Sequence, residues 1–531
     1  MAATTPSDGN LTLIELLVDG ASLEPDSDAL IASGGPRLTH AELQAAILRT
    51  ASKLKRTGLN PGDLVSLAFP NTIEFVVVFL AVAKLRCVAA PLNSAYTPEE
   101  FRFSMQDAGS SLLLIPGLEG NKSAEEAADQ LGLPVAGIHW GKEEETGLLI
   151  VEVTPKNRLE LNSEKEDLDL PHPVGSDVAL FLHTSGTTSR PKGVPLTQFN
   201  LASSVKNIVG TYELSVTDKT VVVLPLFHVH GLMCSLLSTL ASGGTAILPA
   251  AGRFSAATFW KDVKEYGATW YSAVPTVHQI LLARHRSNPE AEYPELRFIR
   301  SCSASLAPAV LANLEEAFSA PVLEAYAMTE ASHQMTSNPL PSHGPHKPGT
   351  VGKPTGIELA ILDDNGEKQE KTKQGEVCIR GPNVTTGYKD NPEANKTAFA
   401  FGWFHTGDRG FLDEDGYVTL TGRIKELINQ GGEKISPLEV DAVLLAHPAV
   451  SEAVAFAAPD EKYGEVVNAA VVLHKGESAT EQDILAFCKK NLAQFKLPRR
   501  TFFADELPRT ATGKIQRRIV AEHFLSGKKG S

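Results

Sequence analysis

The stretch Thr184-Ser-Gly-Thr-Thr-Ser-Arg-Pro-Lys192-Gly193 decides how the chain is interpreted. It follows the apolar run 178–182, which reads as a buried strand, and it precedes a helical pattern over 200–212 for which Thr197 is a candidate cap. Glycine lets a backbone approach an anion, hydroxyls and amides can donate to it, and Lys192 adds a positive charge. The stretch is therefore a candidate phosphate site, although taken alone it fits a flexible surface loop equally well.

Length and composition limit the class of protein. A chain of 531 residues exceeds what one hydrophobic core supports, so we expect two or more domains. The net charge of −14 argues against nucleic acid as a partner, because phosphate contacts need a basic face. The five cysteines are scattered without metal-ligand spacing, which is typical of reduced thiols.

No segment has the pattern of a membrane anchor or an export signal. Residues 1–17 lack the basic start and long apolar run of a signal peptide. The apolar run 75–83 is about half as long as a membrane span requires, and it favours a buried helix. The final residues 527–531 differ from the peroxisomal address Ser-Lys-Leu. We therefore predict a cytoplasmic protein and consider a peroxisomal location less favoured.

Strand and helix patterns alternate along most of the chain, which implies largely parallel sheets covered on both faces. Residues 349–422 are instead rich in strand patterns, and a small α/β unit follows Arg423. We predict an α/β fold in which a large N-terminal domain, 1–424, contains a β-rich subdomain at about 349–422 and is followed by a small C-terminal domain, 425–531.

Four strand ends are rich in small or polar residues, and ligands bind outside the carboxyl ends of strands in open α/β sheets. They are the candidate phosphate loop, residues 225–231 with His228 and His230, residues 300–305, and residues 324–333. Each could be structural when considered separately. Four such ends on one sheet favour a shared site.

Two further features are ambiguous on their own. Taking Asp415-Gly416 as a two-residue hairpin turn places Asp408 opposite Arg423 on the paired strand. This is either a surface ion pair of little energetic value or a pair that holds a ribose. Lys514 follows a small turn near the C-terminus, where a solvated basic segment is the simpler interpretation.

Five segments occur in the order found in the adenylate-forming enzymes. They are 184–193, Tyr326-Ala-Met-Thr-Glu330, Phe404-His-Thr-Gly-Asp408, Gly422-Arg-Ile-Lys-Glu-Leu-Ile428 and Thr512-Gly-Lys514. The chain thus resembles, over nearly its whole length, the superfamily of acyl-CoA synthetases, peptide-synthetase adenylation domains and firefly-type luciferases. The resemblance implies that a carboxylate attacks the α-phosphate of ATP, with Mg²⁺ present, to give an acyl-adenylate and pyrophosphate. A thiol then displaces AMP.

The resemblance also implies roles for individual residues. Those expected to contact the nucleotide are Thr184, Ser185, Gly186, Thr187, Thr188, Ser189, Arg190, Lys192, Ala304, Ser305, Glu324, Ala325, Tyr326, Ala327, Met328, Thr329, Asp408, Arg423 and Lys514. Those expected to act in catalysis are Lys514, Thr329, Glu330 and His228, with Glu330 as the Mg²⁺ ligand. Lys425 is the expected hinge of a mobile C-terminal domain, and Gly431 and Gly432 are expected to approach coenzyme A, although they could form a simple turn.

The expected acid pocket is short and polar. Ser301-Cys-Ser-Ala-Ser305 stands where many members of the superfamily have glycines, and we expect the acid to contact His228, His230, Ser303 and His333. Unpaired polar groups against an alkyl chain are unfavourable, so this pocket should reject fatty acids. No aspartate near Phe227 is available to pair with an amino acid, and no carrier segment follows Ser531, so coenzyme A is the expected thiol.

The segments 181–208, 301–308 and 323–333 resemble the oxalate–CoA ligases of plants and fungi. The resemblance predicts an enzyme that converts oxalate, ATP and CoA to oxalyl-CoA, AMP and pyrophosphate through oxalyl-adenylate, the first step of CoA-dependent oxalate degradation. The alternatives are a ligase for malonate or an aromatic acid such as coumarate, and a non-catalytic nucleotide-binding protein on the same fold. We expect a monomer with small-molecule partners, no nucleic acid and no membrane span.

Overall fold

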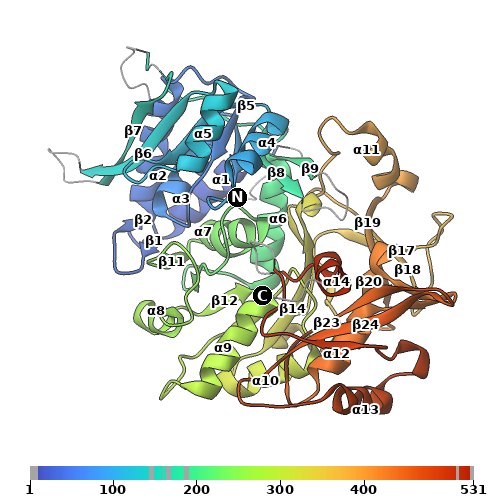
Figure 1. Cartoon of the computed structure of the whole chain (residues 1–531). Coiled ribbons are helices and arrows are strands. Elements are labelled where there is room, and N and C mark those ends of the chain that lie inside the picture. Colours follow the sequence, from blue (N-terminus) through green and yellow to red (C-terminus); the bar gives the residue numbers. More distant parts are fainter. Residues whose placement is uncertain are drawn as a thin grey trace, which may run out of the picture.

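Figure 1 shows the computed structural model, which describes residues 10–142, 149–159, 161–162, 169–184, 191–509 and 514–526. A nine-stranded sheet lies at its centre. In spatial order its strands are β16 (Lys353–Pro354), β15 (His333–Ser337), β14 (Val322–Met328), β13 (Phe298–Ser301), β12 (Trp270–Ala273), β10 (Lys219–Val221), β11 (Thr245–Leu248), β1 (Asp28–Ala32) and β2 (Arg37–Thr39). The strands from β14 to β1 pair in parallel, as the alternating pattern predicted.

The second large sheet has seven strands and lies in the upper part of Figure 1. Its order is β7 (Leu149–Lys156), β6 (Val135–Lys142), β5 (Ser110–Pro116), β3 (Leu64–Leu67), β4 (Val88–Pro91), β8 (Val178–Thr184) and β9 (Lys192–Thr197). The strands from β6 to β8 are parallel, and the two edge strands are antiparallel to their neighbours. Both sheets therefore fit the predicted α/β fold.

The helices that flank these sheets follow local signals in the sequence. Helix α2 (His40–Lys55) begins at a capping box in which Thr39 and Glu42 bond to each other's backbone. Helix α3 (Ile73–Lys84) is buried over 75–83, as its apolar run predicted. No helix among the described residues is long and apolar enough to cross a membrane. The other helices are α1 (Leu13–Leu23), α4 (Pro98–Ala108), α5 (Lys122–Leu131), α6 (Gln198–Tyr212), α8 (Phe259–Tyr266), α9 (Pro275–Ser287), α10 (Pro308–Phe318) and α11 (Pro392–Ala398).

Two segments near the site have local structure that the sequence pattern did not specify. The candidate phosphate loop joins β8 to β9 as an antiparallel hairpin in which Thr184 pairs with Lys192, so it does not lead directly into a helix. Helix α6 begins only after β9, with Thr197 as the predicted cap. The loop residues 185–190 lie outside the described residues. The segment after His228 forms a π-helix, η1 (His230–Leu237), followed by α7 (Ser238–Ala241), and π-helices are frequent at functional sites.

The β-rich part is a four-stranded antiparallel sheet of β17 (Glu358–Leu362), β18 (Gly375–Arg380), β19 (Phe404–Leu412) and β20 (Val418–Arg423). Asp408 faces Arg423, which confirms the predicted pair. The assumed two-residue turn is wrong, because Asp413 N donates to Tyr417 O across a longer turn. An irregularity in the ladder next to Gly410 shifts the register by one residue and restores the predicted pairing.

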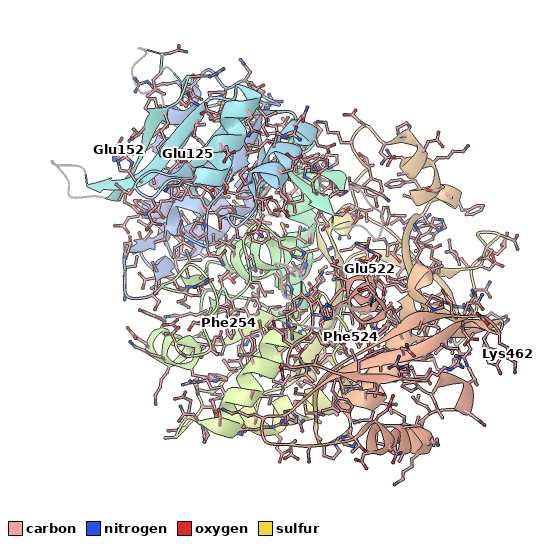
Figure 2. The ribbon with its side chains drawn as sticks, viewed as in Figure 1. Glu125, Glu152, Phe254, Lys462, Glu522 and Phe524 are labelled. Carbon is pink, nitrogen blue, oxygen red and sulfur yellow. The ribbon has the colours of Figure 1, made fainter. Side chains whose placement is uncertain are left out.

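The C-terminal part has a core of its own, formed by residues between 428 and 492. Its elements are β21 (Ile428–Gln430), β22 (Glu433–Ile435), α12 (Pro437–Leu445), β23 (Val450–Asp460), β24 (Gly464–Leu473), α13 (Glu481–Asn491), β25 (Thr501–Phe503) and α14 (Arg517–Leu525). Phe524 on α14, labelled in Figure 2, stacks on Phe502 at 5.1 Å between ring centroids. The domain boundary at 424/425 stays a prediction.

Side chains of α9 form hydrogen bonds to this C-terminal part of the chain. Gln279 Nε2 donates to Ser451 O at 3.0 Å, and Arg286 Nη1 lies 2.8 Å from His474 Nε2. Arg509 Nη1 donates to Thr276 Oγ1 at 2.7 Å. These contacts hold the C-terminal part against the nine-stranded sheet.

Candidate active site

A cluster of basic side chains lies where η1, β13 and β15 meet. We call His228, His230, Arg300, Ser303 and His333 the histidine–arginine cluster. The Nδ1 atom of His230 lies 2.9 Å from Ser303 Oγ, and its ring stacks on His333 at 4.9 Å between centroids. His228 Nδ1 accepts from the His230 backbone N–H at 3.1 Å. The structure therefore brings together all four residues predicted to contact the acid.

The backbone is strained at two of these residues. Ser303 has φ +74° and His333 has φ +98°, and the neighbouring Ser332 has φ +50°. Positive φ is unfavourable for residues other than glycine and typically costs about 1–3 kcal/mol at each position. Glycine would relieve this strain, so the presence of serine and histidine here indicates that the side chains themselves are needed.

The three histidines are uncharged near neutral pH. Burial, together with the nearby Lys514, lowers the pKa of His228 to about 3. Burial also holds the pKa values of His230 and His333 well below 6.5, and the Arg300 guanidinium lowers them further. Neither ring nitrogen of the buried His333 has a hydrogen-bond partner among the described residues. A buried polar group without a partner is suited to a ligand, and here the adjacent charges favour an anion.

A second group of side chains lies at the end of β14 and on β19 and β20. Tyr326 donates a hydrogen bond from Oη to Asp408, and the other carboxylate oxygen of Asp408 lies 2.8 Å from Arg423 Nε. This arrangement contains the predicted ribose pair next to Tyr326, which was predicted to contact the nucleotide. A carboxylate oriented in this way can accept hydrogen bonds from two hydroxyl groups.

Glu324, also on β14, has an unusual environment. Its Oε1 accepts from Leu306 N at 2.8 Å, whereas Oε2 has no partner among the described residues. Burial raises the pKa of this carboxyl to about 8, so it carries a proton near neutral pH. Ala304 and Ser305, which precede Leu306, are exposed and can approach a ligand.

The predicted phosphate lysine and the predicted metal ligand lie on either side of Tyr388. Tyr388 Oη donates to Glu330 Oε1 at 2.8 Å, and Lys192 Nζ lies 4.4 Å from the centroid of the Tyr388 ring. Mg²⁺ usually binds one or two carboxylates together with phosphate oxygens and waters, which this donor set fits. Thr329 precedes Glu330 in the short helix η2 (Thr329–Ala331). Tyr388 was not among the residues predicted to form the site.

Lys514 reaches this region from the C-terminal part of the chain. Its ammonium is electrostatically coupled to Asp408 and Arg423 and to the histidine–arginine cluster. Burial lowers the pKa of Lys514, and the nearby Arg423 lowers it further. Residues 510–513 lie outside the described residues. Lys514 thus interacts with side chains of both the nucleotide group and the acid group, and its role in catalysis stays a prediction.

Arg300, like Tyr388, is a functional candidate that sequence reasoning missed. It stands within the strand end 300–305 but was not assigned a role. Its side chain is fully buried and donates from Nε to Tyr212 Oη at 2.6 Å. Nη2 donates to Gln334 Oε1 and Nη1 to Ser272 Oγ, both at 3.1 Å. An arginine in a buried strand was a possible signal, because charged residues are seldom fully buried without a function.

The predicted hinge and the CoA-contacting residues occupy the surface. Lys425 is exposed in the short helix η5 (Ile424–Glu426). Gly431 and Gly432 form the turn between β21 and β22, with φ +62° and +99°, which matches the simple turn considered as an alternative. The roles of these three residues remain predictions.

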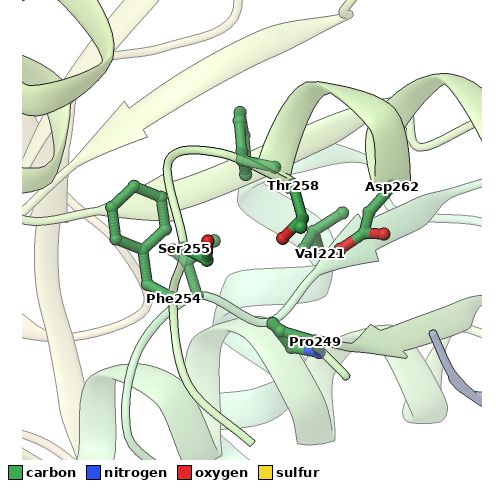
Figure 3. A pocket seen from close by; sticks show the side chains of 8 residues that line it. Val221, Pro249, Phe254, Ser255, Thr258 and Asp262 are labelled. Atoms are coloured by element: carbon green, nitrogen blue, oxygen red, sulfur yellow. The ribbon is translucent and has the colours of Figure 1, made fainter. Parts of the chain in front are cut away.

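A small hollow lies elsewhere, between β10 and α8 (Figure 3). Phe254, Ser255, Thr258 and Asp262 help to line it, and its empty volume is about 150 Å³. Ligand pockets usually measure about 300–1,000 Å³, so this hollow is too small for a nucleotide or CoA. The site described above is therefore the better candidate for binding the substrates.

Comparisons with known proteins agree on the fold and the kind of site. The family model described as AMP-binding enzyme matches residues 18–389, and that of the AMP-binding enzyme C-terminal domain matches residues 439–514. The chain is 62% identical to an oxalate–CoA ligase of Arabidopsis thaliana, over 97% of this chain and 99% of that protein. It is 46% identical to an oxalate–CoA ligase of Saccharomyces cerevisiae, over 88% of each. ATP-bound MatB from Rhodopseudomonas palustris is 30% identical, with a TM-score of 0.84 over 98% of this chain and all of that one.

Proposed function

Because the chain belongs to the AMP-binding enzyme family, we propose that it is an ATP-dependent ligase that joins oxalate to coenzyme A, releasing AMP and pyrophosphate. The observation that carries the choice of acid is the histidine–arginine cluster, in which the buried His333 offers two unpartnered nitrogens beside Ser303 and Arg300. The names of the plant and yeast relatives support the same substrate. Such a pocket is polar and positive, which suits a small dicarboxylate and disfavours an alkyl chain.

The first half-reaction joins two anions, so the site must offset their repulsion. One carboxylate oxygen of oxalate attacks the α-phosphorus of ATP, and pyrophosphate leaves. Lys514 is positioned to place its ammonium between the two reactants, where it stabilises negative charge in the transition state. Ser303 and His333 hold the second carboxylate of oxalate and fix its orientation.

The nucleotide is held by groups on the other side of Lys514. Asp408 and Arg423 bind the ribose, Tyr326 contacts the adenine, and Lys192 with the loop 185–190 binds the β- and γ-phosphates. Glu330 is the residue that would hold Mg²⁺, which when bound neutralises phosphate charge. Enzymes of this family use ATP, Mg²⁺ and CoA. The first half-reaction needs a cation between the reactants, a carboxylate that binds Mg²⁺ and an acceptor for the ribose hydroxyls, and the residues named above supply all three.

In the second half-reaction the thiolate of CoA attacks the oxalyl carbonyl carbon, and AMP leaves. We propose that the C-terminal domain turns about Lys425 between the two steps, which withdraws Lys514 and brings Gly431 and Gly432 towards the thiol. The electrostatic interaction of Lys514 with Asp408 supports assigning this conformation to the first step. We propose further that the enzyme is a monomer and acts in the cytoplasm.

A panel of acids tests the substrate. Pyrophosphate release should be measured with ATP, Mg²⁺ and CoA on oxalate, malonate, coumarate and octanoate. Oxalate should give the highest kcat/KM. Turnover of coumarate or octanoate well above that of oxalate would end the proposal, and absence of pyrophosphate release with every acid would instead indicate a nucleotide-binding protein without catalysis.

A variant of Lys514 tests the two-step scheme. Lys514→Ala should abolish formation of oxalyl-adenylate yet leave CoA transfer from supplied oxalyl-AMP close to that of the unmodified protein. Lys496→Ala, which removes a lysine paired with Glu439 on the surface, is the control and should leave both steps unchanged. Equal loss of both half-reactions in Lys514→Ala would contradict the scheme.

A further inference from the structure

Arg300 is a fully buried cation without an acidic partner among the described residues. The groups that accept its hydrogen bonds are all neutral: Tyr212, Ser272, Gln334 and the uncharged ring of His230. Lys514, which together with Arg300 acts electrostatically on His230 and His333, is also positive. Buried charges are normally paired because an isolated charge is strongly disfavoured away from water. The anion that balances Arg300 is therefore expected to come from outside the chain.

Arg300 also fixes the tautomer of His230. Its Nη1 lies 3.3 Å from His230 Nε2, and a guanidinium can only donate hydrogen bonds, so Nε2 must present its lone pair. The ring proton is then on Nδ1 and donates to Ser303 Oγ at 2.9 Å. Ser272 fits the same arrangement, because its Oγ accepts from Arg300 Nη1 and lies 2.6 Å from His230 Nε2, to which its hydroxyl can donate.

This arrangement determines what Ser303 offers to a ligand. Since Ser303 Oγ accepts from His230, the serine hydroxyl proton is left to donate into the acid pocket. His333, stacked on His230, adds a ring nitrogen without a partner in the described part of the chain. Two donors and the field of a buried guanidinium thus converge on one place, which favours a group that only accepts hydrogen bonds and carries negative charge.

We propose that Arg300 is a positioning residue that selects acids with a second carboxylate, acting through His230 and Ser303 and through its uncompensated buried charge. The inference rests on the proposed oxalate–CoA ligase function and names the group that gives it specificity. An acid of the same size with a neutral far end leaves the buried charge unbalanced and is rejected.

Oxalate and its monoamide, oxamate, provide the test, because they differ little in size but by one charge at the far end. In the unmodified protein kcat/KM for pyrophosphate release should be about a hundredfold higher with oxalate than with oxamate. Arg300→Gln should reduce this ratio to less than about tenfold, mainly by lowering the value for oxalate, while KM for ATP stays the same. Arg300→Lys, which keeps the charge, should restore part of the ratio.

Controls separate specificity from folding. Arg297→Gln removes an arginine three residues away that pairs with Asp218 at 2.5 Å, and it should leave the oxalate/oxamate ratio unchanged even where it lowers the melting temperature. Ser303→Ala removes the hydroxyl that accepts from His230 and leaves Arg300 in place, so it should also reduce the oxalate/oxamate ratio. The inference can therefore be tested even if Arg300→Gln does not fold. An unchanged ratio in Ser303→Ala, or equal loss for both acids in Arg300→Gln, overturns the inference. Absence of oxalate turnover in the unmodified protein overturns the proposed function instead.

Discussion

Replacing Glu324 with glutamine should remove a loss of stability that the protein undergoes as the pH rises. Glu324 is 3% exposed, and burial raises the pKa of its carboxyl from 4.5 to about 8. The unfolded chain loses this proton near pH 4.5, whereas the folded protein keeps it until about pH 8. Between these values the folded state binds more protons than the unfolded state, so the free energy of unfolding falls as the pH rises.

The size of the effect follows from the width of that window. Each pH unit between the two pKa values changes the free energy of unfolding by about 1.4 kcal/mol, which gives about 3 kcal/mol at pH 7 and about 5 kcal/mol at pH 8 as an upper limit. Glutamine keeps the oxygen that accepts from Leu306 N and has no proton to lose. Entropies of unfolding scale with chain length, so for a chain of this size about 3 kcal/mol corresponds to about 3 °C in Tm.

The assay is the melting temperature of the unmodified protein and of Glu324→Gln between pH 4.5 and 8.5. The two curves should meet near pH 4.5 and separate with rising pH, with the variant more stable. Glu414→Gln, at an exposed position, is the control and should follow the unmodified protein. A difference in Tm that is constant with pH, or that grows towards acid, would refute the assignment of a buried, protonated carboxyl.

Three further predictions concern the site. Asp408→Asn should raise KM for ATP by about 10- to 100-fold, because charge-assisted hydrogen bonds to the ribose are lost, and leave KM for oxalate unchanged; steady-state pyrophosphate release measures both, and an unaltered KM for ATP would speak against the ribose role. His333→Leu should lower kcat/KM for oxalate at least about tenfold and improve that for butyrate, since an apolar wall replaces two unpartnered nitrogens; a parallel fall for both acids would argue for a purely structural histidine. Glu330→Gln should raise the Mg²⁺ concentration needed for half-maximal activity about tenfold, as a carboxylate ligand is lost, and a titration that superimposes on that of the unmodified protein would exclude Glu330 as the ligand.

Local signals in the sequence were sufficient wherever a feature depends on residues close together in the chain. The cap at Thr197 needs only neighbouring residues, and it was predicted correctly. The cross-strand pairing of Asp408 with Arg423 was also predicted, but from a turn that the structure does not contain. The correct pairing results from an irregularity in the ladder that compensates for the longer turn.

By itself, the sequence determined the alternating α/β pattern, the resemblance to adenylate-forming enzymes and the residues expected around the nucleotide and the acid. Only the tertiary structure decided which of these side chains interact. Arg300 meets Tyr212, 88 residues earlier in the chain, and Gln334, 34 residues later, because β13 and β14 run side by side and β15 returns next to them. Contacts at such separations depend on the order of strands in the sheet, and local periodicity carries no information about that order. The protonation and charge of the histidine–arginine cluster follow from burial and from those contacts, so they too appear only in the folded chain.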